Sequence, residues 1–387
     1  MGYMSASSSH SPNLIVPGQV TPAPAQQLYV TNASGAVQRT IAVTPRVDPG
    51  FFRKLLTDLN PLRSELRTAV RAHPWIGVTV LALDALATAN VGNPFLFYDR
   101  RERWKEVSGL LEGSRSDLWR SYFDDVSPNW QGSASQMLQQ HIRFNVHPLY
   151  SRLDKISRAM SDVMHSLYKE VVEYDLSLLG LYAGNAPIIK LLSKLSANPA
   201  SSVAMYTQMG IFAAALGNLT KQFADIFVTY ESQLQKLELA LNDIKGAFYI
   251  GGDPTQGPRD LKLSSSVTSP TSIADVWQPF PGKAGGTTGG SGFQTATDYL
   301  KRFAHTMSDC GTGVELLKEV PPRFEGWGLA PLSGIPLVGL WFVRRLDVIV
   351  DTWADGVHIL GAVLKADSKK LIATADKYIE VTTPGVK

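Results

Sequence analysis

The chain has 387 residues, enough for two or three domains and a sizeable buried core. Hydrophobic residues make up 44% of it and charged residues 18%, which is the balance of a folded soluble protein and excludes a wholly disordered one. The formal net charge of +3 is small and evenly spread, so we predict no nucleic-acid partner.

Residues 1–48 are rich in Ser, Pro, Ala and Gln and lack an apolar stretch behind a basic start, so they do not form a secretory signal. We predict a mostly disordered N-terminal tail, with a short extended piece at Leu28, Tyr29 and Val30. If the protein leaves the cell, a Sec-type signal is not the route.

Residues 49–99 form a predicted helical N-terminal region. From Phe51 onwards, apolar side chains recur at steps of three and four, the spacing of one helix face, and Pro61 is expected to kink or divide this helix. The apolar stretch from Trp75 to Ala89 contains a single acid, Asp84. It is shorter than the roughly 20 residues of a membrane span, and we predict a helix buried on most sides.

Residues 100–250 carry the clearest helical pattern. One apolar stripe precedes a predicted turn at residues 127–133. A second stripe follows Pro148 and repeats every seven residues, at Leu153, Met160, Leu167 and Tyr174. Two such helices joined by a short turn cover their seams by folding back into an antiparallel hairpin. A third long helix repeats Phe223, Tyr230, Leu237 and Ile244, and its more apolar start, residues 205–219, is expected to be buried.

Residues 251–292 are rich in Gly, Pro and Ser and predict a flexible linker, followed by a second helical module at residues 293–387. Val357, Leu364, Leu371 and Tyr378 form a further seven-residue seam there, which requires a helix partner. The predicted fold class is all-α: a long antiparallel hairpin or bundle, a linker and a second helical module. Cys310, the only cysteine, is interpreted as a spectator thiol near a Gly-rich turn or as the site of an intermolecular disulfide.

The sequence contains no HExxH, CxxC or GxSxG pattern, the signatures of common catalytic and metal-binding sites. His141 and His147 are six apart, not the i,i+4 spacing that places two ligands on one helix face. We therefore predict a protein that is not an enzyme and uses no cofactor.

Trp130 and Gly132 form a Trp-x-Gly motif in the predicted turn between two long amphipathic helices. In this context, the stretch from Arg100 to about Leu179 resembles the WXG100 (ESX) superfamily of type VII secretion substrates, and the C-terminal part is similar to a small ESX-type helical hairpin. Glycine lets the chain turn without steric cost, and the indole can pack across the helix ends. This chain departs from the family in its length and in its extra N-terminal helical region.

The resemblance implies export through a type VII system, from the cytoplasm to the cell envelope or beyond. It also implies protein partners, either by self-association or with an ESX-type helical partner, although the first module can also pair internally with the final helices. The family's export signal is Tyr-x-x-x-Asp/Glu after a hairpin. Tyr249 and Asp253 fit it after the third long helix, whereas Tyr378 and Glu380 are followed by Thr382 in the acidic position.

Two alternatives remain open. One is a helical membrane-active protein that uses the uncharged segment Gly326–Val343, which a packed loop also explains; its candidate membrane or partner contacts are Trp327, Leu337, Leu340, Trp341 and Phe342. The other is the targeting module of a type VII toxin.

Overall fold

The structure is a computed structural model, and it describes residues 26–31, 37–43, 50–71, 74–130, 133–195, 198–249, 253, 261–263, 268, 291–321, 323 and 335–382. Trp327, Gly132 and most of the predicted linker lie outside these residues.

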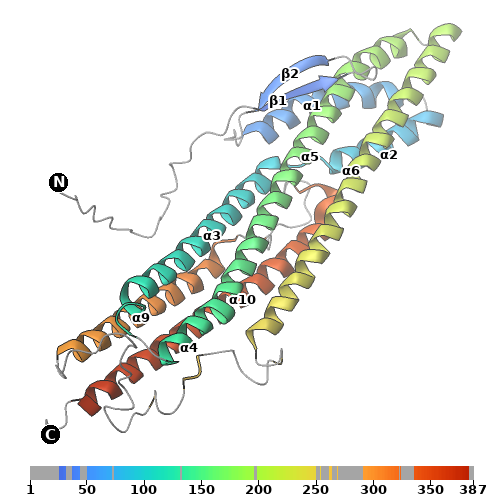
Figure 1. Ribbon diagram of the computed structural model, residues 1–387. Coiled ribbons are helices and arrows are strands. Elements are labelled where there is room, and N and C mark those ends of the chain that lie inside the picture. The colour runs from blue at the N-terminus through green and yellow to red at the C-terminus, as the bar shows by residue number, and fades with distance from the viewer. Residues whose placement is uncertain are drawn as a thin grey trace, which may run out of the picture.

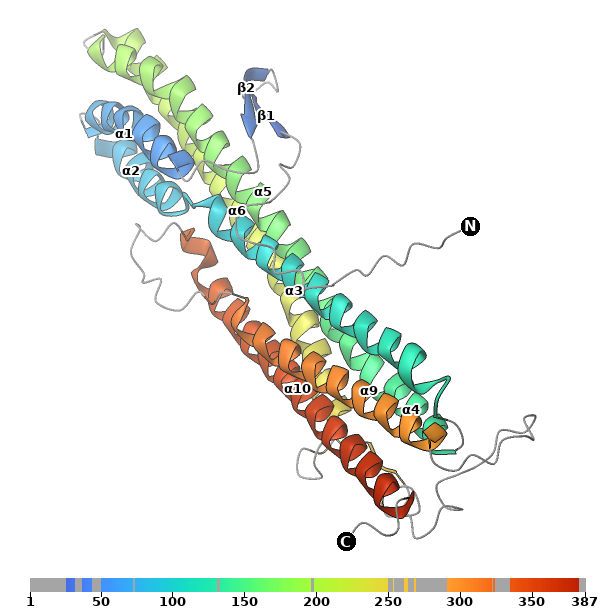
Figure 2. The same cartoon turned by 90° about the vertical axis from the view of Figure 1, so that its left-hand side faces the viewer.

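Long helices run side by side along one axis and form an elongated bundle (Figures 1 and 2). The helices are α1 (Gly50–Arg71), α2 (Pro74–Ala89), α3 (Pro94–Ser121), α4 (Ser133–His141), α5 (His147–Lys194), α6 (Pro199–Phe248), α9 (Ser291–Leu316) and α10 (Leu340–Thr382). Shorter segments are the π-helical η1 (Tyr122–Val126) and η2 (Ile142–Val146) and the 3-10 helices η5 (Leu317–Glu319) and η7 (Leu337–Gly339). The predicted all-α class is confirmed for the described residues, apart from one small strand pair.

That strand pair lies in the predicted N-terminal tail. β1 (Gln26–Thr31) and β2 (Val37–Val43) form an antiparallel hairpin in which Leu28 pairs with Ile41, and β1 lies against α5. The expected extended piece is therefore one strand of a pair, because its partner strand supplies the backbone hydrogen bonds that a lone extended segment lacks.

α3 and α5, which the sequence places in the predicted hairpin, pack against each other. α3 and α5 have opposite chain directions, since Ser108 donates a hydrogen bond to Asp154, whereas farther along α3 Trp119 donates one to His147. The four seam residues from Leu153 to Tyr174 are all buried. The seam therefore faces the helices that the heptad pattern required.

The second limb of the hairpin begins earlier than expected. Instead of starting at Pro148, it follows α4 and η2 into α5, and Pro148 lies directly after the π-helical η2, at the start of α5. The resulting limb, Ser133–Lys194, is about 90 Å long at 1.5 Å per residue. Pro61 likewise lies inside α1 and does not divide it.

The C-terminal helices pack into the same bundle. α9 and α10 pair closely, and they also contact α3, α5 and α6. Trp104 of α3 and Trp353 of α10 meet edge to face with ring centroids 5.2 Å apart, and both are at most 2% exposed. The seam from Val357 to Tyr378 is buried. The first module and the final helices thus meet internally.

The pairing of α9 with α10 depends on two glycines. A Cβ atom at Gly361 would lie 2.7 Å from the Gly311 carbonyl oxygen, and one at Gly311 would lie 2.8 Å from the Gly361 carbonyl oxygen. Only residues without a side chain allow the two backbones to approach this closely. Cys310 lies next to this contact, inside α9 and not at a turn, and burial raises the pKa of its thiol to about 11.

Two predictions of burial are wrong. In α2, Gly77, Val80, Asp84 and Ala87 form one buried face, while Val78 and Leu86 are exposed. In the 205–219 stretch of α6, Met205 and Met209 are buried, but Tyr206 and Ile211 are exposed. Both segments are apolar on nearly every side, so the sequence pattern does not predict which side of the helix packs against the bundle.

Candidate functional site

The turn that carries the Trp-x-Gly motif is closed by hydrogen bonds within the chain. The backbone N–H groups of Ser127 and Trp130 donate to the carbonyl oxygens of Tyr122 and Val126, at 2.9 and 2.7 Å. The Trp130 side chain is only 8% exposed. The residue therefore stabilises the end of the hairpin from within and offers little surface to a partner.

Beside this turn lies an aromatic surface formed by Trp119, Phe123, Phe144 and His147. Phe123 and Phe144 are 56% and 65% exposed, and each lies in one of the two π-helical segments, η1 and η2. A π-helical turn holds an extra residue, so side chains beyond it move off the face that a regular helix would keep buried.

The two limbs of the hairpin hold this surface in register. Trp119 Nε1 donates to His147 Nδ1 at 3.2 Å, and the Trp119 ring stacks on Phe123 with centroids 5.6 Å apart. Phe123 lies one helical turn after Trp119, and Phe144 lies about one turn before His147. Because the two limbs have opposite chain directions, both phenylalanine rings lie at the same level of the bundle. The Arg143 guanidinium lies over the Phe144 ring, 5.5 Å from its centroid.

His147 is kept neutral in this setting. Burial and the nearby positive charge of Arg115 lower its pKa, and the opposing effect of Glu112 is smaller. The neutral imidazole accepts the Trp119 hydrogen bond at Nδ1, which a protonated ring could not do.

His141, the other histidine of the sequence pair, has a separate structural role. Its Nε2 lies 2.7 Å from Asp367 Oδ2, and the second oxygen of that carboxylate accepts the Leu261 backbone N–H at 2.8 Å. This contact ties α4 to α10 and to the chain beyond α6. No group of His, Cys, Asp and Glu within the described ranges could hold a metal ion.

A buried ionic network joins α1, α2 and α5. Asp84, whose side chain is 0% exposed, accepts hydrogen bonds from Arg63 Nε at 2.9 Å, from Arg67 Nε at 2.8 Å and from Tyr182 Oη at 2.5 Å. Burial alone would raise the pKa of Asp84, but these donors and the Arg63 charge together lower it. Asp84, the single acid of the apolar stretch, thus anchors α2 to α1 and α5.

The described part of the apolar segment Gly326–Val343 packs into the bundle. The Val338 backbone N–H donates to Asn90 Oδ1 at 2.8 Å, and the Phe342 ring meets Phe227 edge to face at 5.6 Å. Leu340 is half-buried, whereas Leu337 and Trp341 are each 43% exposed. The candidate contact residues therefore do not form one exposed face.

Pro336 of the same segment seats against Gly92, at the junction of α2 and α3. A Cβ atom at Gly92 would lie 2.7 Å from Pro336 Cγ and 2.9 Å from Val171 Cγ1. The Gly92 N–H donates to Asp175 Oδ1 at 3.2 Å, and complete burial raises the pKa of that carboxyl well above its ordinary value. The junction thus joins the N-terminal helices, α5 and the C-terminal segment.

The candidate export residues differ in accessibility. Tyr378 is 3% exposed on the buried face of α10, and burial raises its pKa to about 12, while Glu380 is exposed and pairs with Lys377 at 2.7 Å. Tyr249 is half-buried directly after the end of α6 at Phe248, and Asp253 is exposed. The second pair is the more available of the two to a receptor.

No family model, curated protein or solved structure matches this chain.

Two helical stretches, Ile76–Val126 and Ala134–Lys194, are long and apolar enough to cross a membrane by length and composition, a test that buried helices of soluble proteins also pass. The sequence interpretation missed Phe123 and Phe144. A signal existed, because both are aromatic residues displaced from the apolar stripe on either side of the predicted turn.

Proposed function

We propose that this chain is a non-enzymatic helical protein that acts by binding protein partners, and that it is exported by a type VII pathway as the WXG100 class is. The observation that carries the proposal is the aromatic surface beside the Trp130 turn. Exposed aromatic rings with arginine alongside are the side chains that dominate binding energy at protein interfaces.

The partner that we propose first is a second copy of this chain, since hairpins of the WXG100 class pair with like hairpins. The Trp119–His147 hydrogen bond fixes two rings that would otherwise need ordering on association, which lowers the entropic cost of binding. An ESX-type helical partner would use the same surface.

Sedimentation velocity over a range of concentrations tests self-association. We expect the full chain to form a dimer or larger species that the double variant Phe123→Ser, Phe144→Ser loses. Val228→Ser is the matched control, because Val228 is 58% exposed and lies on α6 away from the aromatic surface. A chain that stays monomeric at every concentration would refute self-association.

Secretion from a host with and without its type VII ATPase tests the export part. We expect secretion only with the ATPase, and a reduction by Tyr249→Ala with Asp253→Ala. Equal secretion in both hosts would remove the type VII assignment without affecting the binding proposal.

The membrane-active alternative through residues 326–343 has less support, because Val338 and Phe342 are held by Asn90 and Phe227. Nothing on the described surface favours the toxin-targeting alternative over a binding protein.

A further inference from the structure

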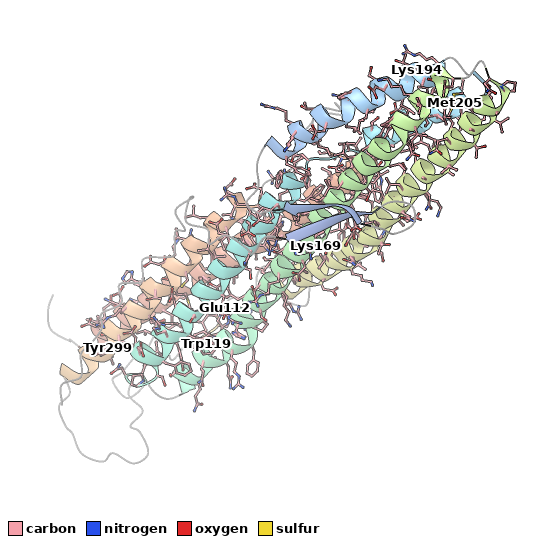
Figure 3. The ribbon with its side chains drawn as sticks, turned by 90° about the horizontal axis from the view of Figure 1, so that it is seen from above. Glu112, Trp119, Lys169, Lys194, Met205 and Tyr299 are labelled. Atoms are coloured by element: carbon pink, nitrogen blue, oxygen red, sulfur yellow. The ribbon has the colours of Figure 1, made fainter. Side chains whose placement is uncertain are left out.

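The end of the bundle farthest from the aromatic surface is formed by the last turns of α5 and the first turns of α6. We call it the apolar tip and define it by Ile188, Leu191, Leu195, Val203 and Tyr206, which are between 41% and 66% exposed. Together with Ile211, these are six of the sixteen exposed large apolar side chains in the described part of the chain. Figure 3 places Lys194 and Met205 together at this end, with Trp119 and Tyr299 toward the other.

The charges at the tip are mostly positive. Residues 176–220 contain no acidic side chain, and Lys190 and Lys194 are their only charged residues. Arg71, at the end of α1, is also exposed. Glu65 of α1 pairs with Lys190 at 2.5 Å and leaves Lys194 free of any described acid partner. The tip therefore complements a negatively charged surface.

The exposed apolar residues of the tip form one stripe on each helix, with Ile188, Leu191 and Leu195 at the i, i+3, i+7 spacing of α5 and Val203 and Tyr206 at the i, i+3 spacing of α6. On the inner side, Ile189, Met205 and Met209 are completely buried between the helices. On the outer sides, α5 presents Leu191 and α6 presents Val203 to solvent. A protein partner typically covers one contiguous patch. A lipid bilayer contacts every exposed side of a segment that inserts into it, so apolar stripes on two helices fit a bilayer better.

The dimensions agree with shallow insertion. Ile188 and Leu195 are seven residues apart on α5, about 10 Å along the axis, and Val203 and Tyr206 lie within the same distance of the start of α6. This matches the depth of about 5–10 Å to which interfacial helices bury their apolar side chains. Tyr206 would then lie at headgroup level, where tyrosine is enriched, and the lysines would extend their ammonium groups to the phosphates.

We propose that the apolar tip docks on an anionic lipid bilayer, with the adjoining ends of α5 and α6 inserted to about the depth of the headgroup boundary. This contact is independent of the aromatic surface, which lies at the opposite end of the bundle and stays accessible to a protein partner. The tip thus gives the chain a second, chemically distinct interaction site.

Flotation of the full chain with vesicles tests the proposal. We expect the chain to float with vesicles of phosphatidylcholine and phosphatidylserine in equal parts, and less with pure phosphatidylcholine or in high salt. The double variant Leu191→Glu, Leu195→Glu should bind the anionic vesicles at least tenfold more weakly. Lys194→Glu should weaken binding to anionic vesicles and leave binding to neutral ones unchanged.

The matched control is Val228→Glu with Leu239→Glu. These side chains are 58% and 65% exposed, like the tip leucines, but they lie about 44 and 60 Å along α6 from its start. The control should bind vesicles like wild type, and far-UV circular dichroism should show all variants folded. The aromatic-surface variant Phe123→Ser, Phe144→Ser should also bind normally, which separates this proposal from the proposed function.

Three results would overturn the proposal. Wild type could fail to float with either vesicle, or the tip and control variants could lose binding equally. The tip variant could also alter sedimentation of the chain without altering flotation, which would make the tip a docking surface for protein instead of lipid.

Discussion

Replacing Gly361 with alanine should separate α9 from α10. The new Cβ would collide with the Glu315 side chain and lie 2.7 Å from the Gly311 carbonyl oxygen, and a backbone atom cannot move aside without moving its helix. Overpacking of this kind costs about 1–3 kcal/mol, against a gain of up to about 1 kcal/mol from the better helix propensity of alanine. We therefore expect Gly361→Ala to lower the free energy of unfolding by about 1–2 kcal/mol.

Gly109 provides the matched control on the surface of α3. Nothing lies within 4 Å of a Cβ atom there, so Gly109→Ala should raise the free energy of unfolding by up to about 1 kcal/mol. Urea denaturation followed by far-UV circular dichroism compares the two midpoints. If Gly361→Ala were as stable as Gly109→Ala, the close approach of α9 and α10 would be refuted.

Two further predictions concern buried charge. Asp84→Ala should lower the free energy of unfolding by about 3–5 kcal/mol, because Arg63 and Tyr182 lose a buried partner; a thermal midpoint equal to that of wild type would contradict the network. The fold lowers the pKa of His147 below its ordinary value of 6.5, so the unfolded chain takes up a proton at this residue before the folded chain does. The stability that neutral His147 contributes is therefore complete above pH 6.5 and is lost as the pH falls from 6.5 to the lowered pKa. Thermal melts above and below 6.5 should show this loss in wild type and a smaller one in His147→Gln, and an equal loss in both would exclude His147 as its source.

The heptad spacing predicted much of the bundle correctly, because it reports directly which side chains share a helix face. Leu153, Met160 and Leu167 are buried as a line, and so are Val357 and Leu364. The spacing does not say which helix covers a seam. The contact of α3 with α10 through Trp104 and Trp353 depends on pairing residues far apart in the sequence.

The candidate surfaces were less predictable, for two physical reasons. Phe123 and Phe144 are exposed because π-helical turns break the regular period, and the sequence pattern assumes that period throughout. Tyr206 of the apolar tip lies in residues 205–219, which were expected to be buried because their composition matches a core. An exposed segment with that composition has the same sequence signature, and only the arrangement of α1, α2, α5 and α6 distinguishes the two.

The unbroken limb from α4 to α5 carries Phe144 near one end and Leu195 just beyond the other. In physiological salt, charges are screened over about 8 Å, a small fraction of the roughly 90 Å length of this limb. A change of charge at one end therefore has no electrostatic effect on residues at the other end. Any communication between the two ends has to be mechanical, by a rigid displacement of the limb against its neighbours.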